Sequence, residues 1–190
     1  MDVPFIPPCD NSKALFEKRV CFDRFVSAVY FTGVAERMLL DFKFNAHLWL
    51  VDDFVDWLEA ALSAVVDPAI FDLVLPMPVS LCHRIERSYN QSALLAKGLA
   101  KRMDRKFAGS AMRRKLNVKR QSSLDADARW ENAKDSFAVL RPEFLEGRTV
   151  LVVDDILTTG ATLSECARAL KAAGAWKVWA LTLARKSLEI

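Results

Sequence analysis

The chain has 190 residues, of which 52% are hydrophobic, and this is enough for one domain with a full core. A formal net charge of +3 does not by itself indicate a nucleic-acid-binding protein, and no apolar run reaches the roughly 18 residues of a membrane-spanning helix. The start, MDVPFIPPCDNS, lacks the basic and apolar regions of a signal peptide. We therefore expect a cytoplasmic protein without a membrane partner.

The N-terminal half of the chain predicts two strands and three helices. Residues 25–30 fit a short strand, and residues 33–66 carry apolar side chains at helical spacing over two successive helices. The apolar run 71–77 predicts a buried strand, which ends at prolines because proline cannot donate to a sheet. After a polar loop, Asn90 is typical of a helix N-cap and predicts a third helix.

The C-terminal half predicts the central strand of a sheet. Residues 104–148 are poorly periodic, with short strands expected near 112–116 and 137–140. The β-branched run 149–153 is typical of a central parallel strand, and a helix over 162–173 follows and ends before Gly174. A last strand is expected over 176–183. This order of elements predicts an α/β fold with a mainly parallel sheet.

The stretch VLVVDDILTTGATL, residues 150–163, places two carboxylates, Asp154 and Asp155, after a buried strand. Ligands of open α/β sheets bind beyond the carboxyl ends of the strands. A hydroxyl-rich loop follows and leads into a helix N-terminus, whose free N–H groups bind phosphate. The residues of this predicted phosphate-binding loop are Thr158, Thr159, Gly160, Ala161 and Thr162.

The two carboxylates would repel a phosphate, so they should face a different part of the ligand. Sugar hydroxyls donate hydrogen bonds to carboxylates, and a hydrated Mg²⁺ also binds them. A ligand that carries a phosphate close to a free diol, such as a ribose 5-phosphate, satisfies both halves of the motif.

Three other interpretations of the motif agree less well with the sequence. A receiver domain also places an acidic pair after an apolar strand, but about 100 residues follow it there, whereas 35 residues follow Asp155 here. A P-loop needs G-x-x-x-x-G-K-[ST], and the chain has no such string. A simple acidic turn cap does not account for the threonine and glycine loop directly behind the pair.

At these residues the chain resembles the signature of type I phosphoribosyltransferases, which Val150 to Thr162 match throughout. The resemblance implies a mainly parallel five-stranded sheet flanked by helices, with a small N-terminal hood and a mobile loop. It implies 5-phosphoribosyl 1-pyrophosphate (PRPP) as ligand and Mg²⁺ as cofactor. Asp154 and Asp155 would be the catalytic pair on the ribose hydroxyls, and residues 158–162 would hold the 5-phosphate. Mg²⁺ would bind through PRPP and water near the acidic pair, without a direct protein ligand.

A second stretch is similar to the competence protein F (ComF) and amidophosphoribosyltransferase-like branch of that family. The branch pattern is P-x-P, two spaced arginines, G-F-N-Q and a helix, with Ser88 and Tyr89 here in place of the glycine and phenylalanine. The matching residues are Pro76, Pro78, Arg84, Arg87, Asn90 and Gln91. A later part of the pattern is matched by Gln121, Leu124, Arg129, Asn132 and Phe137.

The resemblance also assigns roles to basic residues. Arg84 and Arg87 follow the second predicted strand, where a pyrophosphate-binding loop would lie, and arginine binds phosphate oxygens in pairs. The family's mobile loop would close over the site from the basic stretch 113–120, although a solvated surface explains that stretch equally well. The basic residues assigned to this flexible loop are Arg113, Arg114, Lys119 and Arg120.

Many members of the branch carry an N-terminal zinc ribbon, and residues 1–30 look like a degenerate remnant of it. Residues 31–190 would then form the phosphoribosyltransferase domain. Cys9 and Cys21 would each be the one remaining cysteine of a C-x-x-C pair. Two thiolates cannot complete a zinc site with four ligands. We therefore expect no zinc, unless the chain dimerises across these residues.

Two functions remain open from the sequence. The first is an enzyme that transfers phosphoribosyl from PRPP to an unidentified base. The second is a non-catalytic PRPP-binding module that binds single-stranded DNA during competence, DNA uptake or recombination, with Tyr89, Phe107 and Trp130 as stacking residues. No set of residues in the sequence identifies the acceptor base. The sequence also leaves open whether the chain forms a homodimer.

Overall fold

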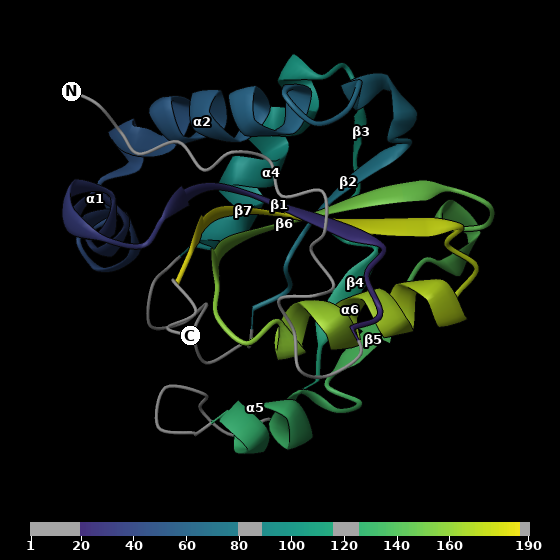
Figure 1. Ribbon diagram of the computed structural model, residues 1–190. Helices are drawn as coiled ribbons and strands as arrows, with labels where there is room; N and C mark the ends of the chain where they lie inside the picture. The colour runs from purple at the N-terminus through teal and green to yellow at the C-terminus, as the bar shows by residue number, and fades with distance from the viewer. Residues whose placement is uncertain (1–19, 80–88, 116–125, 187–190) are drawn as a thin grey trace.

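A five-stranded sheet forms the centre of the computed structural model, which describes residues 20–79, 89–115 and 126–186. The strand order is β1–β7–β6–β2–β3, and every pair of neighbours runs parallel (Figure 1). The strands are β1 Arg24–Tyr30, β2 Leu73–Pro76, β3 Lys106–Phe107, β6 Thr149–Leu157 and β7 Lys177–Arg185. The predicted α/β class with a parallel five-stranded sheet is therefore confirmed.

Helices cover both faces of this sheet (Figure 1). Helices α2 (Val51–Ser63) and α4 (Gln91–Arg102) pack on one face, and α6 (Ala161–Ala172) packs on the other. Helix α1 (Gly33–Phe44) connects β1 to the α2 layer, and α5 (Ala126–Ala133) contacts α6. The two helices expected within residues 33–66 and the third after Asn90 are thus confirmed.

Short elements complete the described part of the chain. Strands β4 (Met112–Arg114) and β5 (Phe137–Val139) pair antiparallel, close to where two short strands were expected. The 3₁₀-helices η2 (Leu48–Leu50), η3 (Pro68–Ile70) and η5 (Pro142–Phe144) lie in connections. Neither these turns nor α5 was predicted, because each is too short for a clear periodic pattern.

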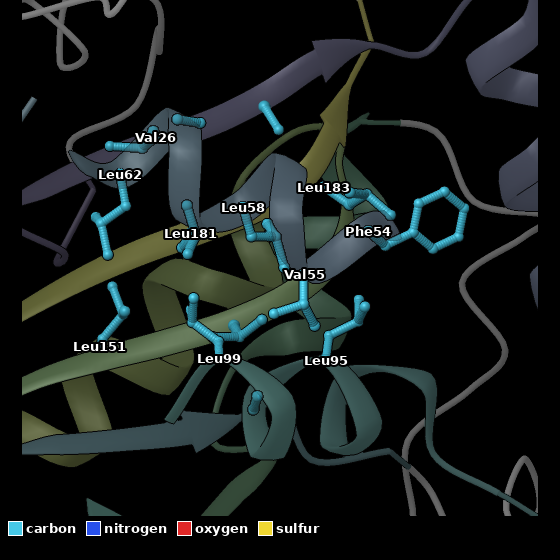
Figure 2. Packing of buried hydrophobic residues seen from close by; sticks show 14 of the residues in the cluster. Val26, Phe54, Val55, Leu58, Leu62, Leu95, Leu99, Leu151, Leu181 and Leu183 are labelled. Atoms are coloured by element: carbon cyan, nitrogen blue, oxygen red, sulfur yellow. The ribbon is translucent and has the colours of Figure 1, made fainter. Parts of the chain in front are cut away.

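The central strand β6 is buried on both faces, which explains its continuous apolar sequence. Successive side chains of a strand point to opposite faces. Leu151 therefore joins the cluster under α2 and α4, while Val150 and Val152 join the cluster under α6. Figure 2 shows the first cluster, in which leucines of α2 and α4 meet those of β6 and β7.

Strand β6 is longer than the sequence predicted, since it ends at Leu157 and not at Val153. Aspartate disfavours strands, so the acidic pair was placed after the strand. Strand β7 continues alongside, however, with Asp154 opposite Thr182 and Leu157 opposite Arg185. The hydrogen bonds to β7 outweigh the local preference and carry the acidic pair into the strand.

The first described residues join the main sheet. Strand β1, which the sequence interpretation assigned to the N-terminal segment, pairs with β7 over its whole length. Cys9 lies outside the described residues, and Cys21 is a free, half-buried cysteine. The division into residues 1–30 and 31–190 stays a prediction. No helix in the described ranges is both long and apolar enough to span a bilayer.

Candidate functional site

The acidic pair lies at the carboxyl edge of the sheet, where β2 stops before its neighbour β6. Pro76 of β2 is opposite Val153, so Asp154 and Asp155 extend beyond the end of β2 while β7 still flanks them. The chain leaves β2 through α4 on one face and leaves β6 through α6 on the other. Such a topological switch point opens a crevice beyond the strand ends, and this is where α/β sheets bind ligands.

Asp154 is held from two sides. Its Oδ1 atom accepts hydrogen bonds from the Ser92 hydroxyl of α4 and from the backbone N–H of Asp155, both at 2.9 Å. The residue as a whole keeps some exposure, but its carboxyl group is enclosed. Burial raises the pKa of Asp154 to about 7, and the charge of Asp155 acts in the same direction. The hydrogen bonds and Lys43 oppose this shift.

Asp155 forms an ion pair that sequence reasoning missed. The Nζ atom of Lys43, in the last turn of α1, lies 2.9 Å from Oδ2 of Asp155. The other oxygen, Oδ1, accepts the backbone N–H of Ile156 at 2.7 Å. Both residues are largely buried, with side-chain exposures of 24% for Lys43 and 16% for Asp155. Only the tertiary fold brings α1 to this strand end, so a local sequence pattern held no signal for it.

The predicted phosphate-binding loop turns from β6 into α6. Gly160 is the N-cap of α6 and has a left-handed backbone with φ +75° and ψ −4°, which favours glycine over any other residue. The backbone N–H of Ala161 lies 3.4 Å from Oγ1 of Thr159. Thr158 and Thr159 are half-buried in front of the helix start. The structure thus places the hydroxyls and the positive end of a 12-residue helix beside the acidic pair.

The predicted basic residues divide into three groups. Arg84, Arg87, Lys119 and Arg120 lie outside the described residues. Arg113 is on β4 and exposed. Arg114 is half-buried, with its guanidinium carbon 5.7 Å from the centre of the Phe137 ring. Burial lowers the pKa of Arg114, and the charge of Asp154 acts in the opposite direction, so Arg114 contributes positive potential at the acidic pair.

The aromatic residues proposed for base stacking are engaged in the fold. The Tyr89 hydroxyl donates to the carbonyl of Phe42 at 2.6 Å. Phe107 packs against the cluster under α2 and α4, and Trp130 packs against the cluster under α6. All three residues are half-buried, and the most exposed aromatic rings of the described chain lie elsewhere, at Phe44, Trp49 and Trp176.

The donor set suits a hydrated magnesium ion better than a closed metal site. No group of three or more His, Cys, Asp or Glu side chains gathers anywhere in the described ranges. Mg²⁺ keeps several waters and commonly binds near one or two carboxylates together with substrate phosphates. Asp154 and Asp155 supply such carboxylates, so they fit an ion that reaches them through water and ligand.

Comparison with known proteins agrees with this geometry. The family described as "Phosphoribosyl transferase domain" matches residues 90–188, which run from the cap of α4 through β7. The chain belongs to this family. The acidic pair and the predicted phosphate-binding loop both lie inside the matched region.

Curated relatives of this chain include proteins whose names refer to competence and to DNA utilization. Competence protein F of Haemophilus influenzae is 27% identical over 169 residues, covering 86% of this chain and 73% of the relative. DNA utilization protein YhgH of Escherichia coli is 32% identical over 112 residues, covering 58% of this chain but only 48% of YhgH. A solved adenine phosphoribosyltransferase of Thermoanaerobacter pseudethanolicus, 18% identical, aligns with a TM-score of 0.46 over 76% of this chain and 84% of its own.

Proposed function

We propose that this chain binds PRPP with Mg²⁺ and transfers its phosphoribosyl group to a nitrogenous base. The observation that supports the proposal is the joint placement, at one switch point, of the acidic pair and of the glycine-capped start of α6. A phosphate on the helix start and a ribose diol on the carboxylates would fit one ligand. The membership of the family supports the same ligand class.

The proposed reaction breaks the bond between C1 of the ribose and the pyrophosphate oxygen, and forms a bond from C1 to a nitrogen of the base. Pyrophosphate leaves with the bonding electrons, and the base nitrogen supplies the new pair. When bound, Mg²⁺ neutralises charge on the pyrophosphate. Asp154 and Asp155 would accept hydrogen bonds from the ribose hydroxyls and orient C1. Arg84 and Arg87 are proposed to bind the leaving pyrophosphate.

The first test is a calorimetric titration of PRPP with Mg²⁺ into the wild type and into Asp154→Asn/Asp155→Asn. We expect the wild type to bind and the variant to lose at least about 100-fold in affinity, because hydrogen bonds to charged groups contribute roughly 1.5–3 kcal/mol each. The matched control is Asp52→Asn/Asp53→Asn, which changes a second adjacent acidic pair that is exposed in the first turn of α2. Equal affinity in both variants, or no wild-type binding, would contradict the proposal.

A second candidate function is a PRPP-binding, non-catalytic module that binds single-stranded DNA. The names of two relatives, competence protein F and DNA utilization protein YhgH, support this second candidate. Fluorescence anisotropy with a labelled oligonucleotide would detect it, and a steep loss of affinity with salt is expected for a phosphate-dominated contact. Release of pyrophosphate in the presence of individual bases, without oligonucleotide, would instead support the transferase.

A further inference from the structure

The C-terminal end of α1 is anchored by residues 89–91, which directly precede and begin α4. The last carbonyls of a helix have no donors within the helix. Here the Tyr89 hydroxyl donates to the carbonyl of Phe42 at 2.6 Å, and Nε2 of Gln91 donates to the carbonyl of Lys43 at 3.2 Å. Gln91 is 3% exposed, so its amide is committed to this contact.

The same short segment also contacts β2 and β6. Nδ2 of Asn90 donates to the carbonyl of Met77 at 3.3 Å, just beyond β2, and the Ser92 hydroxyl donates to Asp154. Residues 89–92 therefore connect the end of α1, the end of β2 and the acidic pair. A shift of this segment would move all three together.

The anchored end of α1 places the ammonium group of Lys43 beside Asp155. A lysine side chain is long and flexible and usually extends into water. Here its Nζ lies 2.9 Å from a carboxylate oxygen, and the backbone carbonyl of the same residue is fixed by Gln91. The hydrogen bond from Gln91 restrains the backbone of Lys43, and the ion pair restrains its Nζ atom.

The charge of Lys43 matters because the proposed ligand is a polyanion. Two adjacent carboxylates repel an approaching pyrophosphate and also repel each other. A lysine beside Asp155 offsets one of the two negative charges and leaves Asp154 as the second acceptor.

We infer that Lys43, held by Tyr89 and Gln91, is a positioning residue that orients the acidic pair through Asp155 and offsets its negative charge, so that a polyanionic sugar phosphate can approach it. This inference rests on the proposed function for its ligand, but its effect on the acidic pair is a property of the ligand-free protein. Gln91 thereby has a role that its place in the family pattern does not reveal.

The test compares Lys43→Met, Lys43→Arg and, as control, Lys101→Met. Lys101 carries the same charge but lies exposed in the last turn of α4, at the other end of the helix from Ser92. In titrations of PRPP with Mg²⁺ we expect Lys43→Met to lose about tenfold or more in affinity. Lys43→Arg should stay within about threefold of wild type, and Lys101→Met should bind like wild type.

A second readout is the thermal stability of the same proteins without ligand between pH 5 and 9. Removal of the Lys43 charge raises the pKa of Asp154 further, so the decline of stability with rising pH should extend to higher pH and become larger in Lys43→Met, and not in Lys101→Met. An unchanged pH profile in Lys43→Met would overturn the inference, and so would wild-type affinity of this variant for PRPP.

The two readouts separate the inference from the proposed function. If the wild type does not bind PRPP, the proposed function fails, and the ligand-free pH profile still decides whether Lys43 acts on the acidic pair. If the wild type binds and Lys43→Met binds equally well or more tightly, the inference fails and the proposed function stands. A Gln91→Leu variant keeps the Lys43 ammonium but removes the hydrogen bond that anchors the end of α1. Its affinity for PRPP should lie between those of the wild type and Lys43→Met.

Discussion

Without ligand at pH 8, an Asp154→Asn variant should be more stable than the wild type, and this advantage should be less than half as large at pH 5. The cause is the raised pKa of Asp154, about 7 in the folded protein, against about 3.9 for an unfolded aspartate. Between these values the folded state binds more protons than the unfolded state. Wild-type stability is therefore fully present below the lower value and is lost as the pH rises through the upper one.

The expected size of this effect follows from the same values. From pH 5 to pH 8 the wild type should lose about 2–3 kcal/mol that the variant does not lose, since one pKa unit corresponds to about 1.4 kcal/mol. For a chain of this size that is a relative shift in melting temperature of about 4–12 °C. Differential scanning calorimetry at both pH values measures it.

Burial sets the direction of the effect, and the charged and titratable groups around Asp154 change its size. Asp155 of the same strand raises its pKa, whereas Lys43 of α1 and Arg114 of β4 favour its ionised form. The Cys166 thiol of α6 is also within electrostatic range, but burial raises its pKa far above neutral, so it stays uncharged. The control is Asp53→Asn on the exposed face of α2, which should differ from wild type by the same amount at both pH values. A parallel pH dependence of wild type and Asp154→Asn would contradict the assignment.

This outcome would also indicate that the Asp154 carboxylate serves ligand binding. An aspartate that destabilises the ligand-free protein at neutral pH is expected where ligand binding, and not folding, requires it. Asp154→Asn should therefore gain stability and lose the stabilisation that we propose PRPP gives to the wild type.

The second large effect is expected in the core, where Phe54→Ala should lower the free energy of unfolding by about 3–5 kcal/mol. The Phe54 side chain is fully buried in α2, with its ring 5.3 Å from Phe42 and 5.4 Å from Trp57 in centroid distance. It belongs to the cluster between the helices and the sheet that Figure 2 shows. Truncation removes these contacts and leaves a cavity that the packed helices cannot close.

Urea denaturation measures the loss as a lower midpoint with an unchanged slope. The matched control is Trp49→Ala, an aromatic truncation a few residues away whose side chain is 70% exposed, and we expect it to change stability by less than about 0.5 kcal/mol. Because the carbonyl of Phe42 accepts a hydrogen bond from the Tyr89 hydroxyl, Phe54→Ala should also loosen the end of α1 and weaken the proposed binding of PRPP. A loss below about 1 kcal/mol would contradict this account of the core.

Local patterns alone predicted most elements and the centre of the site. The N-cap function of Asn90 is confirmed, since its side chain accepts the N–H of Ala93 at 3.3 Å, and Gly174 follows α6 with φ +99°. The glycine of the phosphate-binding loop also has the left-handed backbone that glycine permits. Such features depend on residues within a few positions of one another, so the order of residue types is enough to predict them.

The environment of those residues, in contrast, depends on contacts made by the folded chain. The strand order, the extension of β6 alongside β7, the Ser92–Asp154 hydrogen bond and the Lys43–Asp155 ion pair each join segments far apart in the chain. The raised pKa of Asp154 arises from burial, which no residue within the motif produces by itself. The sequence determined which groups the site contains, and packing determined their charge and their partners, because desolvation and ion pairing depend on distances through space.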